Sequence, residues 1–254
     1  MRSRVAFIPA AGVASRFGGL PKFLLPSAEF RSDDSPSGNL AWPTLLSRHL
    51  SYARRFSDLV ILSTRPENSL LLAPYLVPGK VELLVMETLT MSETVLRMSR
   101  VVPAMENLIL MPDTFFSDEF DSEKMALSED EILSVAVWEV RPHQVGSVGS
   151  VEVSNLDTRP VVSGHRDKDK GSSYAWMWGA MNISRDALEL LDAGTPHVGY
   201  LLDAILALGD ERRVVGARPQ RGAYIDCGTP DGFYDQLSLL RSLPDPAMKL
   251  KPLR

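Results

Sequence analysis

The sequence PAAGVASRFGGLPK, residues 9–22, directly follows a short apolar run at residues 5–9. An apolar run of this length beside turn residues predicts a buried strand. The small residues after it predict a loop whose backbone N–H groups can approach a polyphosphate closely, with Arg16 and Lys22 supplying positive charge. The spacing is that of neither a Walker A loop nor the dinucleotide-binding fingerprint. An alternative interpretation is a strand turn whose two cations only face solvent.

Three more short apolar runs follow in the first half of the chain, at residues 59–62, 81–85 and 108–111. Helical patterns lie between them at residues 44–56, 67–76 and 92–102, the last with Ser92 as its expected cap. This alternation predicts βαβ units, and therefore an α/β fold with a mostly parallel central sheet flanked by helices. The second half is expected to add strands at residues 132–140, 147–153, 174–183 and 213–217, and helices at residues 186–191, 198–208 and 230–243.

Composition limits the class of protein but does not identify it. The 254 residues are 44% hydrophobic and 23% charged, which is ordinary for a globular protein, and we expect a single domain over residues 1–254 with a mobile loop at about residues 27–41. The net charge of −5 argues against a surface built to bind nucleic acid. Lone Cys227, the lack of a signal-peptide pattern and the lack of a membrane-spanning run predict a cytoplasmic protein that binds no membrane. Whether it forms a homo-oligomer stays open.

Two later motifs each deliver an aspartate. The apolar run LILMP at residues 108–112 ends in Asp113, and the sequence GAYIDCGTP at residues 222–230 contains Asp226. A carboxylate at the carboxyl end of a strand offers the oxygen ligands that a hard divalent cation prefers. Thr229 and Pro230 suit the start of a terminal helix. Read alone, Asp113 could merely cap the following turn, and Asp226 could belong to an ordinary strand-to-helix turn.

The three motifs in this order resemble the sugar-phosphate nucleotidyltransferase family: strand, small-residue loop, Arg and Pro-Lys; a strand-ending Asp; and aromatic-x-Asp-x-Gly-Thr-Pro. The resemblance implies a glycosyltransferase A-type, Rossmann-like fold. It also implies an enzyme that transfers a nucleoside monophosphate from an NTP to a phosphorylated acceptor, expected to be a sugar 1-phosphate, releasing pyrophosphate and forming an NDP-sugar. The implied cofactor is Mg²⁺ held by Asp113 and Asp226, and no protein nucleophile is needed.

The family pattern also assigns roles to single residues. It implies catalytic roles for Arg16, Lys22 and Asp113. The implied nucleotide-binding residues of the first loop are Ala10, Ala11, Gly12, Ala14 and Ser15. One departure is Ala14, where the family has a Gly, so the backbone there needs an angle that a residue with a Cβ can adopt.

The segment ETLTMSET at residues 87–94 stands where the family reads the base. The resemblance assigns Glu87 and Ser92 to nucleotide binding, in place of the family's Gln and Gly-Thr pair. A carboxylate accepts hydrogen bonds but donates none, so Glu87 suits guanine or cytosine better than uracil or thymine. Alternatively, Ser92 and Glu93 only begin a helix.

The acceptor side is assigned from weaker matches. The charged sequence HRDKDK at residues 165–170 is expected to be a loop, and the resemblance implies that Lys168, or alternatively Lys170, binds the acceptor phosphate. Gly179 is the implied acceptor-contacting glycine. Trp176 and Trp178 fit either stacking on a substrate or packing. The four histidines show no zinc-ligand spacing and receive no role.

Two other functions remain as rivals. A glycosyltransferase of the same general fold would release a nucleoside diphosphate, although the D-x-D motif common in such enzymes is absent after Asp113. A noncatalytic protein that binds a nucleotide sugar would bind without turnover.

Overall fold

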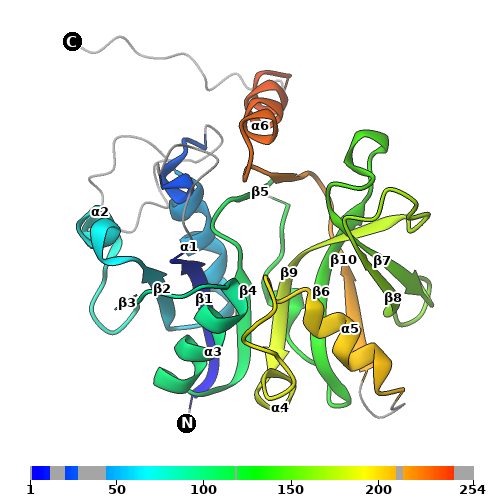
Figure 1. Ribbon diagram of the computed structural model, residues 1–254, viewed down its shortest axis with the longest axis horizontal. Helices are drawn as coiled ribbons and strands as arrows, with labels where there is room; N and C mark the ends of the chain where they lie inside the picture. Colours follow the sequence, from blue (N-terminus) through cyan, green and yellow to red (C-terminus); the bar gives the residue numbers. More distant parts are fainter. Residues whose placement is uncertain (1, 12–20, 28–43, 118, 210–213, 243–254) are drawn as a thin grey trace.

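The computed structural model describes residues 2–11, 21–27, 44–117, 119–209 and 214–242, and its elements form one layered α/β unit (Figure 1). Residues 28–41 of the expected mobile loop lie outside the described residues. The central sheet has nine strands, which lie side by side in the order β3 (Val81–Val85), β2 (Val60–Thr64), β1 (Arg2–Ala10), β4 (Ala104–Leu110), β9 (Trp176–Ser184), β6 (Glu131–Glu139), β10 (Val214–Pro219), β8 (Val161–Asp167) and β7 (Gly149–Ser154).

The sheet is mixed, which corrects the expectation of a mostly parallel one. Strands β3, β2, β1 and β4 pair in parallel, as the βαβ pattern predicted, and β6 pairs in parallel with β10. Strand β9 runs antiparallel to β4 and β6. Strands β7 and β8 form an antiparallel hairpin, in which β7 also pairs with β9 and β8 with β10. Antiparallel neighbours need no crossover helix, so the second half of the chain can reverse direction within the sheet.

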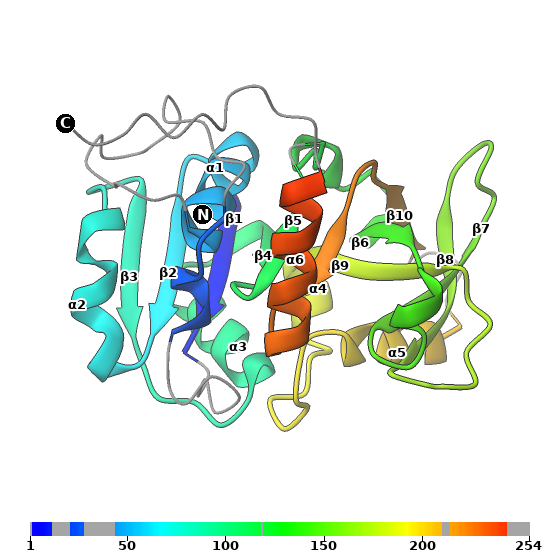
Figure 2. The same ribbon diagram turned by 90° about the horizontal axis from the view of Figure 1, so that it is seen from above.

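Helices cover both faces of the sheet. They are α1 (Leu45–Phe56), α2 (Ser69–Leu72), α3 (Met91–Val101), α4 (Arg185–Leu188), α5 (Tyr200–Ala207) and α6 (Pro230–Ser242). Seen from above, α1 and α3 lie on opposite sides of β1 (Figure 2). The alternation of side chains along a strand explains this arrangement. Ala6 and Ile8 share one buried cluster with residues of α1, while Val5 and Phe7 share another with residues of α3, α4 and α5.

Local capping sets where these helices begin. Helix α1 starts after Thr44, whose Oγ1 accepts a hydrogen bond from the Ser47 N–H at 3.2 Å. Helix α3 is capped by Thr90, which accepts from the Glu93 N–H at 3.0 Å, so Ser92 is not the cap and the expectation for that residue is wrong. Ser184 caps α4 as expected. The pattern at residues 67–76 yields only the four-residue helix α2 between two 3-10 turns, η4 (Pro66–Asn68) and η5 (Ala73–Tyr75).

A separate two-stranded sheet was not expected. Strand β5 (Thr114–Phe116) pairs antiparallel with β11 (Tyr224–Asp226), with Thr114 opposite Asp226. In Figure 1 this pair and α6 lie beyond the carboxyl end of β1, on the side where ligands of α/β sheets bind. Three short 3-10 turns complete the described elements: η2 (Lys22–Leu24), η6 (Glu123–Met125) and η7 (Pro142–Gln144). Within the part of the chain that the structure describes, no helix combines the length and apolar character that crossing a membrane requires.

Candidate functional site

The two-stranded sheet joins the two aspartates that the sequence analysis singled out. Asp113 directly precedes β5 and Asp226 ends β11, and the antiparallel register sets these positions beside each other. The N–H of Cys227 donates a hydrogen bond to the Asp113 carbonyl at 2.8 Å, which extends the pairing by one residue. Two backbone segments far apart in the sequence are therefore fixed to one another where both carboxylates emerge.

The side chain of Lys22 also reaches these aspartates. It opens the 3-10 turn η2, and its Nζ donates a hydrogen bond to Asp113 Oδ2 at 2.9 Å. Both side chains are partly buried, with 18% of the Lys22 side chain and 29% of the Asp113 side chain exposed. Partial burial reduces solvent screening of this ion pair.

Gly228 shows how tightly these groups are gathered. A Cβ on this residue would lie 2.7 Å from Asp226 Oδ1, 3.0 Å from Asp113 Oδ2 and 3.5 Å from Lys22 Nζ. The two carboxylates and the ammonium group therefore surround one position, which only a glycine leaves free. The backbone N–H of Gly228 also donates a hydrogen bond to Asp226 Oδ1 at 2.7 Å.

The surroundings of Asp226 disfavour its negative charge. Burial raises the pKa of Asp226, and the negative charge of Asp113 raises it further, while the Gly228 N–H and the cations Lys168 and Lys22 act in the opposite direction. Lys168 thus acts on the same carboxylate as Lys22. Such a pair of neighbouring carboxylates is stabilised by any additional positive charge that enters the site.

Lys168 is positioned by an unusual backbone turn. It directly follows β8, has φ +51°, and its N–H donates a hydrogen bond to the Val148 carbonyl at 3.2 Å. Lys170 instead packs beside Gly146, where a Cβ would lie 2.6 Å from Lys170 Cγ. Of the two lysines considered for the acceptor, Lys168 is the one whose charge acts on Asp226. The expected loop at residues 165–170 is in part strand, because His165, Arg166 and Asp167 pair with β7.

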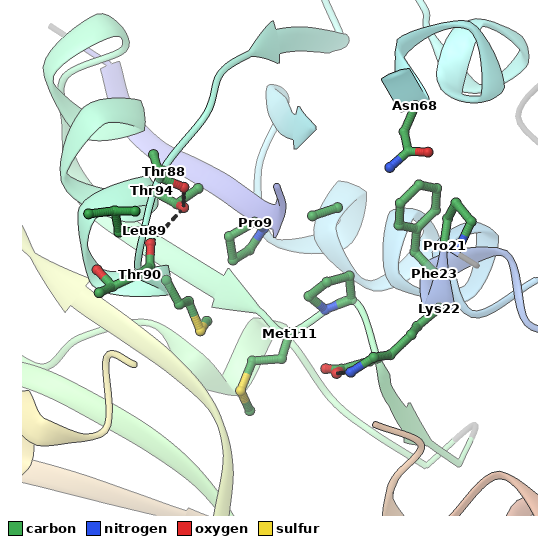
Figure 3. Close-up of a pocket in the computed structure, with 14 residues that line it drawn as sticks. Pro9, Pro21, Lys22, Phe23, Asn68, Thr88, Leu89, Thr90, Thr94 and Met111 are labelled. Carbon is green, nitrogen blue, oxygen red and sulfur yellow. Dashed lines mark hydrogen bonds and ion pairs between the residues drawn. The ribbon is translucent and has the colours of Figure 1, made fainter. Parts of the chain in front are cut away.

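A cavity of about 390 Å³ adjoins the Lys22–Asp113 pair (Figure 3). Its walls come from the end of β1, the turn η2, the segment before α3 and the end of β4. The lining residues are Pro9, Ala10, Pro21, Lys22, Phe23, Asn68, Thr88, Leu89, Thr90, Met91, Thr94, Met111, Pro112 and Asp113. Predicted loop residue Ala10 lies in this wall and Ala11 is fully buried. Gly12, Ala14, Ser15 and Arg16 lie outside the described residues.

The segment expected to read the base contributes different side chains from the predicted ones. Glu87 is exposed, Ser92 is buried with its Oγ 2.9 Å from Thr195 Oγ1, and neither lines the cavity. Thr88 and Thr94 do line it, with their hydroxyls 2.6 Å apart (Figure 3). Hydroxyl groups directly after a strand and at the start of the next helix were a sequence signal that could have found them. Base reading by Glu87 and Ser92 stays a prediction.

Gly179 and Trp178 are accounted for by packing. A Cβ on buried Gly179 would lie 2.5 Å from the Tyr224 ring and 2.7 Å from the Trp138 ring, so these rings account for the absence of a side chain. Trp178 is buried, with its ring centroid 6.0 Å from that of His197. Contact of Gly179 with an acceptor stays a prediction.

His197, to which the sequence analysis assigns no role, pairs with the residue before Lys168. Its Nε2 lies 3.2 Å from Asp167 Oδ2, and both side chains are about four-fifths buried. The sequence signal that could have pointed to this pair is Asp167, which stands next to Lys168. His197 itself comes from a loop thirty residues later.

The described residues at the expected Mg²⁺ site offer few metal ligands. Within the described ranges, no group of three or more His, Cys, Asp and Glu side chains is arranged to hold a metal ion. Asp113 and Asp226 remain a pair of oxygen donors beside a cavity. Mg²⁺ is commonly held by one or two carboxylates and completes its coordination with water and substrate phosphates, so this pair fits that ion.

Comparisons with known proteins bear on the fold. No protein-family model matches the chain, and no curated protein matches it by sequence. Among solved structures, a UDP-glucose pyrophosphorylase complexed with UDP-glucose matches with a TM-score of 0.70 and 16% identity over 95% of this chain and 99% of that one. A UTP-bound UGPase from Acinetobacter baumannii matches with a TM-score of 0.68 and 21% identity, over 97% of this chain and 95% of that one.

A third match is a putative glucose-1-phosphate thymidylyltransferase from Bacillus anthracis in complex with a sucrose. Its TM-score is 0.72 and its identity 14%, over 96% of this chain and 97% of that one. All three are proteins of the kind that the sequence motifs resemble, and each aligns over nearly its whole length. The chain therefore has the α/β fold of solved sugar-phosphate nucleotidyltransferases.

Proposed function

We propose that this protein is a magnesium-dependent nucleotidyltransferase that joins the nucleoside monophosphate of an NTP to a sugar 1-phosphate, releasing pyrophosphate and forming an NDP-sugar. The observation that carries the proposal is the meeting of Lys22, Asp113 and Asp226 around one position, beside a cavity that Lys22 and Asp113 line. The shared fold with proteins described as binding UTP and UDP-glucose adds support.

In this proposal the cavity receives the nucleoside and the charged cluster receives the phosphates. The cavity walls of Thr88, Leu89 and Thr94 offer hydroxyl and apolar contacts to a base. The NTP then extends from the cavity toward Lys22, which lines it as well. Arg16, which the sequence pattern assigns to the β- and γ-phosphates, lies outside the described residues and stays a prediction.

Asp113 and Asp226 would hold the magnesium ion, which would supply positive charge at the transferring phosphate. Lys22 forms an ion pair with Asp113. A triphosphate offers Lys22 more negative charge than one carboxylate, so we expect its ammonium group to move to the phosphates and stabilise the departing pyrophosphate.

The acceptor would approach from the side of Lys168. The positive charge of Lys168 would hold the acceptor phosphate. An oxygen of this phosphate attacks the α-phosphorus in line while the bond to pyrophosphate breaks. Alignment of two anions and neutralisation of their charge are the main requirements of such a transfer, and both are met by the cations gathered here. No side-chain nucleophile is required.

A matrix of NTPs against sugar 1-phosphates tests the proposal. ATP, CTP, GTP, UTP and dTTP are each combined with glucose 1-phosphate and other hexose 1-phosphates in the presence of Mg²⁺, and pyrophosphate release is followed together with the NDP-sugar product. At least one pair is expected to turn over. Release of a nucleoside diphosphate from an NDP-sugar would favour a glycosyltransferase instead. Tight NDP-sugar binding with no turnover of any pair would favour a noncatalytic binding protein.

Matched variants link any activity to the site. Asp226→Asn removes one carboxylate charge with little change in shape, and we expect pyrophosphate release to fall at least about a hundredfold because phosphate transfer depends on this charge. Asp157→Asn is the control, since Asp157 is exposed and lies in the β7–β8 turn, at the opposite end of the hairpin from Lys168. Equal activity of the two variants would remove Asp226 from the mechanism.

A further inference from the structure

His197 makes contacts to several parts of the acceptor side. It lies just before α5, its ring centroid is 4.9 Å from that of Tyr200 and 6.0 Å from that of Trp178, and its Nε2 lies 3.2 Å from Asp167 Oδ2. The aromatic neighbours restrict the ring, and only 21% of the side chain is exposed. The ring orientation is thus determined by packing as well as by the carboxylate.

The hydrogen bonds also determine which ring nitrogen carries the proton. The Gly199 N–H donates to Nδ1 at 3.2 Å, so Nδ1 is an acceptor. The hydrogen of the neutral ring is then on Nε2, from which it is donated to Asp167. Burial lowers the pKa of His197, although Asp167 opposes this effect. A neutral ring with one defined donor follows at neutral pH.

Asp167 is the residue before Lys168, whose backbone makes an unusual turn directly after β8. Asp167 pairs with Gly149 at the end of the β7–β8 hairpin, and the next residue adopts φ +51°, a conformation that costs a residue with a Cβ about 1 kcal/mol or more. Surrounding contacts must hold such a turn in place. The Lys168 N–H is held by the Val148 carbonyl, and the Asp167 carboxylate is held by His197.

The loop that carries His197 is itself anchored to the wall of the nucleotide cavity. Thr90 Oγ1 donates a hydrogen bond to the Ala193 carbonyl at 2.6 Å, and the Met91 N–H donates to the Pro196 carbonyl at 3.2 Å. Thr90 and Met91 both line the cavity. His197 therefore belongs to a segment that is bound to the wall of the cavity, while its ring contacts Asp167, next to Lys168.

We propose that His197 is a positioning residue for the acceptor: its Nε2–H holds the Asp167 carboxylate and thereby the turn that aims Lys168 at the acceptor phosphate. This inference rests on the proposed nucleotidyl transfer. His197 needs no contact with substrate in this role. Its loss should weaken acceptor binding while NTP binding and the fold are retained.

The test compares His197→Leu with His197→Gln by steady-state kinetics. The probes are glucose 1-phosphate and the NTP with which it reacts fastest, or the fastest hexose 1-phosphate of the same matrix. Leu removes the donor, and the KM for the sugar phosphate is expected to rise about tenfold, as when a hydrogen bond to a charged group no longer holds its partner. The KM for the NTP should change less than about twofold. Gln can place an amide N–H near Asp167 and should restore most of the acceptor KM.

His165→Leu is the matched control. His165 lies on the same strand two residues before Asp167 and forms its own pair with Asp203, with Nδ1 3.0 Å from Oδ1. Its loss removes a comparable contact on α5, so a change in stability is expected without a change in acceptor KM. If His197→Leu does not fold, His197→Asn, whose amide is too short to reach Asp167, replaces it in the comparison with Gln.

The outcomes separate the two proposals. An unchanged acceptor KM in the Leu or Asn variant, equal rises in both KM values, or no difference between Gln and Leu would overturn the role of His197 while leaving nucleotidyl transfer intact. Absence of pyrophosphate release by the wild-type protein with every substrate pair would overturn the proposed function, and the positioning role with it.

Discussion

Replacing His49 by Gln should make the fold more resistant to acid. His49 lies on α1 and is fully buried, its Nε2 is 2.9 Å from the Thr114 carbonyl, and its ring meets the edge of Phe116 at 5.2 Å. Burial lowers the pKa of this imidazole from 6.5 to about 4, and the charge of Arg48 adds to the effect, while the Thr114 carbonyl and Asp113 oppose it. The folded protein therefore keeps His49 neutral in mild acid.

The sign and size of the effect follow from linkage. Above pH 6.5 the ring is neutral in both states, so it does not make stability depend on pH. As the pH falls from 6.5 toward 4, the unfolded chain takes up a proton that the folded chain refuses, and the free energy of unfolding falls. The two pKa values, 6.5 and about 4, correspond to a loss of about 3 kcal/mol, which is complete below about pH 4.

Urea unfolding at intervals between pH 8 and pH 4 measures this loss. Gln cannot titrate but keeps an amide N–H for the Thr114 carbonyl. The wild-type free energy of unfolding should therefore fall by about 3 kcal/mol more than that of His49→Gln, because other titrating groups affect both proteins alike. Exposed His143 supplies the control variant His143→Gln, which should follow the wild-type curve. Parallel curves for wild type and His49→Gln, or an NMR titration of the His49 ring with a midpoint near 6.5, would refute the reasoning.

Three further outcomes follow from packing around the site. Gly228→Ala places a Cβ against both site carboxylates, so pyrophosphate release in the proposed reaction should fall more than about tenfold with little change in the melting temperature; activity equal to wild type would contradict this. Gly179→Ala places a Cβ against the Tyr224 and Trp138 rings, so urea unfolding should show a loss of about 1–3 kcal/mol, and an unchanged midpoint would count against it. The pKa of Cys227 is raised, chiefly by burial, so iodoacetamide at pH 8 should label it only after denaturation; rapid labelling of the native protein by mass spectrometry would be inconsistent with this burial.

Sequence patterns predicted the first half of the fold better than the second. The strands β1 to β4 are apolar and alternate with helical segments, and for such units local pattern and chain direction agree. Residues 165–170 are predicted to be a charged loop because they carry mostly charged side chains, yet His165 to Asp167 form the end of strand β8. Pairing with β7 and β10 makes this segment a strand, and no local sequence pattern reveals that pairing.

The candidate site shows the same division. Asp113, Asp226 and Lys22 were chosen from motifs, and the structure brings them together. The means of doing so, three-residue strands β5 and β11, could not be read from the sequence because each is too short to show a period. Thr88 and His197 were missed for a related reason. Thr88 is distinguished only by its place in a cavity wall, and His197 only by its contact with Asp167, thirty residues earlier in the sequence.

The short sheet also explains how two repelling carboxylates are held so close. Asp113 follows the carboxyl end of β4, and β11, from the far end of the chain, places a second carboxylate beside it. That segment is secured by aromatic packing: the Phe116 ring of β5 stacks on Trp138 at 5.3 Å, and the Tyr224 ring of β11 lies 5.2 Å from Trp138. Stacking and burial of these rings stabilise β5 and β11 independently of the charges above them. The packing of this short sheet thus holds Asp113 and Asp226 together, and Lys22 balances part of their negative charge. In the proposed reaction, the negative charge that remains would favour binding of a cation together with the substrate phosphates.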